Sequence, residues 1–166
     1  MPTQHGATIV CVGSLTSSVS FGTTTTETTI FSKDVPYGIL EPTGTNLHVR
    51  VNGYASSSAV PPTLTLRLYY GSSLMVAIAA APPALAANQG FIAESDITTR
   101  GTGSAFPQAW ALYPNTPQGG HAGITQAASF TTGTTTTVAL KGQYGAATAG
   151  NTVTFTNCIY DVGGLI

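Results

Sequence analysis

The sequence is short of charge. Only 7% of its 166 residues are Asp, Glu, Lys or Arg, whereas an average soluble domain has roughly 25%. The five cations and six anions are scattered and give a net charge of -1. A protein that binds duplex nucleic acid needs a basic patch to displace counterions from phosphates, and five dispersed cations do not form one. Disorder is excluded too, because disordered chains have low hydrophobicity and 42% of this chain is hydrophobic.

Long apolar runs and cysteines are scarce as well. The longest apolar stretch, residues 74–87, is interrupted by two prolines and is shorter than the roughly 18 residues that cross a bilayer. The N-terminus lacks a basic region followed by an apolar one, so we expect neither a signal peptide nor a membrane partner. The two cysteines, Cys11 and Cys158, stand near opposite ends of the chain. Two reduced thiols and one long-range disulfide both fit this spacing.

Threonine, glycine and proline are abundant, with 28, 19 and 10 copies. Two sets of apolar residues stand at every second position with polar residues between them: Leu47, Val49 and Val51, and Leu64, Leu66 and Leu68. A period of two is typical of a β-strand that buries one face.

Nine segments have this alternation or are rich in β-branched and aromatic residues. They are residues 28–33, 45–53, 63–69, 74–79, 91–99, 105–113, 124–130, 135–144 and 151–160. Tyr70-Gly71-Ser72-Ser73 has the length of a hairpin turn, so its flanking strands should pair antiparallel. No segment has a convincing helical period. We therefore predict an all-β, single-domain, antiparallel β-sandwich of eight or nine strands over residues 23–166, similar to a jelly roll.

Residues 1–22 precede the first clear strand and hold four apolar residues, Ile9, Val10, Val12 and Leu15. Two alternatives remain open for this segment. It can be an arm that docks on a neighbouring subunit or capsid, or it can be the first edge strand of the sandwich.

Residues typical of catalysis or metal binding are few. His5, His48 and His121 are isolated, and no metal, phosphate or dinucleotide motif occurs. We expect His48 to point away from the apolar face of its strand, as a solvated or interface residue. Glu94 and Asp96 form the closest acidic pair, but their polar and basic neighbours indicate an ordinary polar face. We expect no catalytic residue, metal or cofactor, and therefore no enzymatic activity.

Aromatic residues offer another candidate site: Tyr69, Tyr70, Trp110, Tyr113 and Tyr144. Rings on a β-scaffold can form a platform on which sugars stack. Alternatively, these residues belong to the core or to a subunit interface, since interfaces favour Tyr and Trp and have little charge at their centre.

Five segments in succession carry a resemblance. They are Thr29–Leu40 with its turn at Pro36, Leu47–Tyr54, Thr63–Gly71, Ile97–Ser104 and Leu140–Phe155. This succession resembles small virion proteins of tailed bacteriophages, the head-decoration (cement) or fibre-like β-sandwich proteins. The likeness covers roughly residues 28–162 and is a pattern of strands and turns, not a catalytic signature.

The resemblance implies a jelly-roll-like sandwich that forms a homotrimer on a phage particle. The expected function is that of a capsid decoration protein, which binds the exterior of the head shell after assembly in the host cytoplasm. Its partners would be the major capsid protein or other virion proteins and further copies of itself. The alternative is a receptor- or glycan-binding tip of a fibre or tail.

Overall fold

The computed structural model describes residues 7–36, 44–101, 104–112, 128–129 and 134–165. These residues form eleven strands and no helix. The strands are β1 (Ala7–Ser14), β2 (Val19–Gly22), β3 (Thr28–Val35), β4 (Asn46–Ser56), β5 (Leu64–Tyr70), β6 (Ser73–Ala80), β7 (Gln89–Gly101), β8 (Ser104–Leu112), β9 (Ala128–Ser129), β10 (Thr136–Tyr144) and β11 (Thr152–Leu165). In these parts of the chain there is no helix long and apolar enough to cross a membrane.

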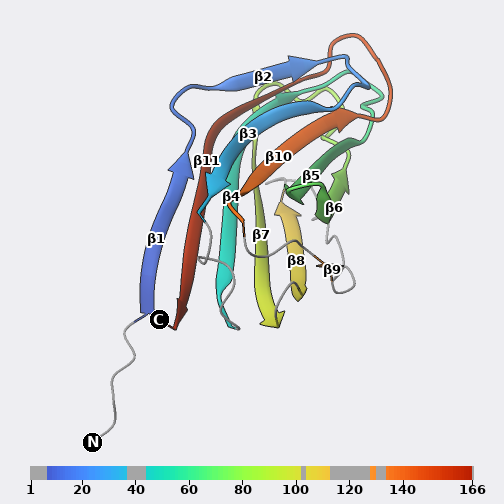
Figure 1. Ribbon diagram of the computed structural model, residues 1–166. Helices are drawn as coiled ribbons and strands as arrows, with labels where there is room; N and C mark the ends of the chain where they lie inside the picture. The colour runs from blue at the N-terminus through green and yellow to red at the C-terminus, as the bar shows by residue number, and fades with distance from the viewer. Residues whose placement is uncertain (1–6, 37–43, 102–103, 113–127, 130–133, 166) are drawn as a thin grey trace, which may run out of the picture.

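The strands form two antiparallel sheets that face each other. The seven-stranded sheet has the order β1-β11-β4-β7-β8-β9, and β2 also pairs with β11. The four-stranded sheet has the order β3-β10-β5-β6 and lies in front of the upper part of the larger sheet in Figure 1. The predicted antiparallel β-sandwich is therefore confirmed.

Nine of the strands correspond to the nine predicted segments. The segments map in order onto β3 to β11, and β5 and β6 pair antiparallel across the predicted turn. Of predicted strand 124–130, only Ala128–Ser129 lies in the described residues. Two further strands, β1 and β2, lie in residues 1–22 and pair with β11. Residues 7–14 thus form a strand at one end of the larger sheet, and an arm that docks through residues 1–22 stays a prediction.

The core lies between the sheets and follows the alternation of the strands. All six of the alternating Leu and Val residues singled out above are buried, with exposures of 5% or less. Larger side chains complete the layer: Phe91, Tyr144, Phe155 and Tyr160 are each 4% exposed or less. Phe155 packs edge-to-face on Phe91, with ring centroids 5.6 Å apart. Every second residue of a strand thus points inward, and the others form the two outer faces.

The cavity between the two sheets in the described residues is too small for a ligand. The cavity between the sheets, lined among others by Val49, Leu66 and Leu140, has a volume of about 20 Å³, whereas ligand pockets hold roughly 300–1,000 Å³. We therefore look for a candidate binding site on the surface of the described residues.

Candidate functional site

A polar row crosses the outer face of the seven-stranded sheet. On β4, Leu47 and Val49 are buried in the core, so the intervening His48 points outward, as predicted. In the sheet register, His48 lies opposite Asp161 of β11 on one side and Asp96 of β7 on the other. Three strands that are far apart in sequence thus place a histidine between two carboxylates.

Short contacts order one side of this row. Nδ1 of His48 lies 3.0 Å from Oδ1 of Asp96, and Nδ2 of Asn46 donates to the same oxygen at 3.2 Å. Two residues further along β4, Nε of Arg50 lies 3.2 Å from Oε1 of Glu94. Glu94 and Asp96 therefore share one face, as predicted, and each is paired with a basic residue of β4.

A depression of about 340 Å³ opens over this row. It is lined by Asn46, His48, Asp96, Asp161 and Gly163, near the ends where β4 begins and β11 finishes, at the bottom of Figure 1. Gly163 contributes no side chain, and Asn46 Oδ1 is buried without a hydrogen-bond partner. The lining is rich in acceptors and carries two carboxylates, so it suits a ligand that donates hydrogen bonds or carries positive charge. No group of three metal-ligating side chains occurs among the described residues.

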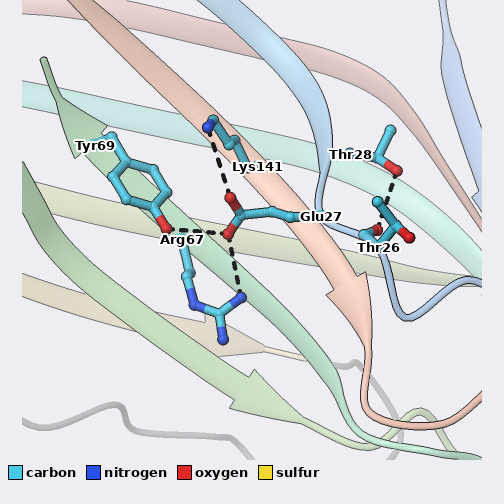
Figure 2. Close-up of polar contacts among 6 residues, drawn as sticks. All are labelled: Thr26, Glu27, Thr28, Arg67, Tyr69 and Lys141. Atoms are coloured by element: carbon cyan, nitrogen blue, oxygen red, sulfur yellow. Dashed lines mark hydrogen bonds and ion pairs between the residues drawn. The ribbon is translucent and has the colours of Figure 1, made fainter. Parts of the chain in front are cut away.

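A second charged cluster lies on the outer face of the four-stranded sheet, where Figure 2 shows Glu27 at its centre. Oε1 of Glu27 accepts hydrogen bonds from Arg67 at 3.2 Å and from the Tyr69 hydroxyl at 3.0 Å. Its Oε2 lies 3.6 Å from Lys141 Nζ, which also stands 4.8 Å from the centre of the Tyr69 ring. Burial and the hydrogen bond to Glu27 raise the pKa of Tyr69. Each charged side chain of this cluster thus has a partner of opposite charge.

Of the predicted aromatic residues, the structure describes the surroundings of Tyr69, Tyr70 and Tyr144. Tyr69 belongs to the Glu27 cluster, whereas Tyr70 and Tyr144 are core residues with exposures of 8% and 0%. Trp110 lies in β8, in register with Glu94, and Tyr113 lies outside the described residues. Burial raises the pKa of Tyr144 to about 12.

One end of the sandwich carries two apolar residues that sequence reasoning missed. Val60 and Leu85 are 79% and 73% exposed, and they lie in the connections that follow β4 and β6. Leu85 has a φ of 54°, in the left-handed region that residues other than glycine, asparagine and aspartate rarely occupy. The prolines in the two connections were the only hint of this feature in the sequence. They predict that the strands end there, but not that Val60 and Leu85 are exposed.

The backbone of these connections is fixed by hydrogen bonds. The hydroxyl of the buried Ser57 donates to the carbonyl of Pro83 and accepts from the N–H of Ala86 at 3.0 Å. The N–H of Leu85 donates to the carbonyl of Ser58 at 3.0 Å.

Asn151 holds the same region from β11's side. Its Oδ1 accepts from the N–H of Ser58 at 3.1 Å, and its Nδ2 donates to the carbonyl of Thr148 at 2.7 Å. Asn151 is 1% exposed. The two apolar side chains are therefore presented by an ordered scaffold; we call Val60 and Leu85 the apolar tip.

The predicted docking-arm residues lie in or beside β1. Ile9 pairs with Gly163 and Val10 with Val162, and Val12 falls at a bulge between Cys11 and Gly13. Leu15, just after the strand, is partly buried and packs against the core. Docking by these residues remains a prediction. Cys158 is a free, fully buried thiol.

No protein-family model matches the chain, and no curated protein matches it in sequence. Solved structures with a similar arrangement include the CBM2 module of the evolved Dit of Lactobacillus casei BL23 phage J-1, with a TM-score of 0.43 and 10% identity over 81% of this chain and 69% of that one. Lectin II from Ulex europaeus has a TM-score of 0.41 and 14% identity, covering 98% and 94%. A chain of infectious bursal disease virus, Gt strain, has a TM-score of 0.37 and 13% identity, covering 96% and 33%. At these values, no ligand or partner is transferred to this chain.

Proposed function

We propose that the chain is a non-enzymatic structural protein of a virion, a capsid decoration protein that binds the outside of a phage head as a homo-oligomer. The observation that carries the proposal is the apolar tip. Val60 and Leu85 are exposed while the backbone beneath them is fixed by buried Ser57 and Asn151. Apolar side chains held in solvent by an ordered backbone offer a surface that a partner can bury.

The low charge of the chain supports the same role. A net charge of -1 produces little repulsion between neighbouring proteins on a crowded shell. A decoration protein stabilises a shell because it binds only the assembled state, and many weak contacts add up over a symmetric particle. The virion as the partner rests on the resemblance of segments 28–162 to phage decoration and fibre proteins.

The test uses phage particles produced with and without the gene. We expect the purified protein to rebind the particles that lack it, saturating at a fixed copy number on the head exterior seen by electron microscopy. Absence from the particles, or density confined to a tail tip, overturns the proposal.

Variants locate the docking surface. Val60→Ser combined with Leu85→Asn should weaken shell binding at least about tenfold, because burial of each side chain is worth roughly 1.5–3 kcal/mol. Leu74→Ser is the matched control, since Leu74 is also exposed, at 47%, but lies on β6. Equal binding by both variants contradicts docking through the apolar tip.

A second candidate function, glycan binding at a fibre or tail tip, is favoured by the depression over His48. The carboxylates of Asp96 and Asp161 in its lining can accept hydrogen bonds from the hydroxyl groups of a saccharide. A labelled glycan array tests this function. Asp161→Asn should abolish any signal, whereas Asp34→Asn, which removes the same charge on the other sheet, should not. An array without signal removes this candidate.

A further inference from the structure

One tyrosine is exposed on the outer face of the larger sheet. The exposed large apolar residues in the described parts of the chain are Val60 and Leu85 of the apolar tip, Leu74 on β6 and Tyr54 on β4. Tyr54 is 38% exposed while the next residue, Ala55, is fully buried, so the tyrosine side chain points away from the core. It lies near the end of β4 and the start of β11, at the top of Figure 1.

The two strands beside Tyr54 differ in what they place next to it. Gly90 of β7 lies opposite Tyr54 in the sheet register, and a Cβ added to Gly90 would meet no described atom closer than 3.9 Å. On the other side, Thr154 of β11 lies opposite Tyr54, and its hydroxyl oxygen is 2.8 Å from that of Ser20 on β2. An exposed aromatic ring thus has an open position on one side and hydroxyl groups on the other. We call Ser20, Thr154, Tyr54 and Gly90 the tyrosine row.

The surroundings of the tyrosine row are polar but uncharged. In the sheet register, no charged residue of the described chain lies in this row or in the row on either side of it. The adjacent rows contain Ser56, whose hydroxyl accepts from the N–H of Asn88 at 3.1 Å, and Asn52. The nearest charge on β4 is Arg50, roughly 13 Å from Tyr54 along the strand. A ligand of this surface therefore meets one aromatic ring with hydroxyl and amide groups around it, and no ionic partner.

We propose that the tyrosine row binds a neutral saccharide, with one sugar ring packed on Tyr54 above Gly90. The face of a sugar ring presents C–H groups that can pack on an aromatic ring, and its hydroxyls can exchange hydrogen bonds with surrounding hydroxyls and amides. A nucleic acid would need cations, and a stable protein interface would need more apolar area than one ring supplies. The inference does not rest on the decoration function, and it concerns the opposite end of β4 from the depression over His48.

A glycan array that carries both neutral and charged oligosaccharides tests the proposal. The neutral probes are oligosaccharides of glucose, mannose, galactose and rhamnose, and the charged probes contain sialic or uronic acids. We expect signal on at least one neutral probe, followed by saturable binding of that oligosaccharide in calorimetry. An array without signal, or with signal on the charged probes alone, overturns the proposal.

Variants locate the contact. Tyr54→Ala should weaken binding at least about tenfold, because an aromatic residue at the centre of a contact carries much of its binding energy, whereas Tyr54→Phe keeps the ring and should bind. Gly90→Leu should weaken binding as strongly, since its side chain would fill the open position while Tyr54 stays in place. Leu74→Ala is the matched control, because it removes an exposed apolar side chain from the other sheet and should leave binding unchanged.

Circular dichroism and thermal unfolding identify a variant that fails to fold. If either Tyr54→Ala or Gly90→Leu does not fold, the other decides. A folded variant of this pair that binds the oligosaccharide as tightly as the parent protein contradicts the proposal.

Asp161→Asn separates this surface from the depression over His48. It should leave binding at the tyrosine row unchanged, and binding that is lost in Asp161→Asn but kept in Tyr54→Ala overturns the proposal in favour of the depression. Shell binding is measured on particles and is independent of the array. Particles that bind a protein without array signal overturn only the saccharide inference, and saccharide binding through Tyr54 without shell binding overturns only the decoration function.

Discussion

At Leu85 the backbone conformation and the side chain are in conflict. Its φ of 54° is uncommon for leucine and more readily adopted by asparagine. We expect Leu85→Asn to leave the free energy of unfolding unchanged or to raise it, while it weakens partner binding. Leu85→Val should lower the free energy of unfolding by about 1 kcal/mol, because a β-branched residue fits this conformation worst. Urea denaturation of the two variants checks the prediction, and equal stabilities contradict it.

Two glycines in adjacent strands differ in the space around them. A Cβ added to Gly53 on β4 would overlap the carbonyl oxygen of Thr154 and lie 3.0 Å from the Phe91 ring. A Cβ on Gly90 of β7 would meet nothing closer than 3.9 Å. Gly53→Ala should therefore lower the free energy of unfolding by about 1–3 kcal/mol. Gly90→Ala should be neutral or stabilise by about 0.4–1 kcal/mol. Thermal unfolding of the two variants measures the difference in stability. A Gly53→Ala variant more stable than Gly90→Ala contradicts the tight packing of Gly53 against Thr154 and Phe91.

At the scale of the strands, Glu27 separates two cations that the sheet places side by side. Arg67 of β5 lies directly opposite Lys141 of β10, a like-charge pair that is unfavourable on its own. We expect Glu27→Gln to lower the free energy of unfolding by about 0.5–1 kcal/mol at low salt, and less at high salt, where the repulsion is screened. In a Lys141→Gln background the same substitution should cost less. Denaturant titrations of the double-mutant cycle measure this coupling, and additive effects contradict it.

The strands themselves were predictable from the sequence because side-chain direction alternates along a strand. Leu64, Leu66 and Leu68 stand at every second position, and all three are buried. The same argument placed Glu94 and Asp96 on one outer face. The sequence did not separate β1 and β2 into two strands, because neither segment has a clear alternation of apolar and polar residues. Their pairing partner, β11, also lies at the other end of the chain.

The candidate site was not predictable because strand pairing across long separations creates it. Asp161 meets His48 only through the register of β11 on β4, and neither residue belongs to a local motif. The apolar tip has the same origin, since Asn151 fixes Ser58 across 93 positions of sequence. The alternation of apolar and polar residues predicts which face of the sheet a side chain is on. It does not predict which residue lies beside it on the neighbouring strand.

At the scale of the whole molecule, the chain has few charged residues. A change of pH therefore alters few ion pairs on its surface. The described groups with strongly raised pKa values are instead buried in the core. Burial raises the pKa of Cys158 from 9.0 to about 12 and that of Tyr144 from 10.0 to about 12. It also raises the pKa of Tyr160. All three must stay protonated for the core to remain packed.

Stability should therefore decrease in alkali. The unfolded chain loses the Cys158 proton near pH 9 and the tyrosine protons near pH 10, whereas the folded chain keeps them to about pH 12. The folded state binds more protons in this range, so the free energy of unfolding falls as the pH rises from 9 to 12. Tyr144→Phe should flatten the fall between pH 10 and 12. At pH 7 it should be neutral or stabilising, because the Tyr144 hydroxyl is buried without a partner. Urea titrations from pH 7 to 12 measure both effects, and a free energy of unfolding that stays constant to pH 12 contradicts the burial of these groups.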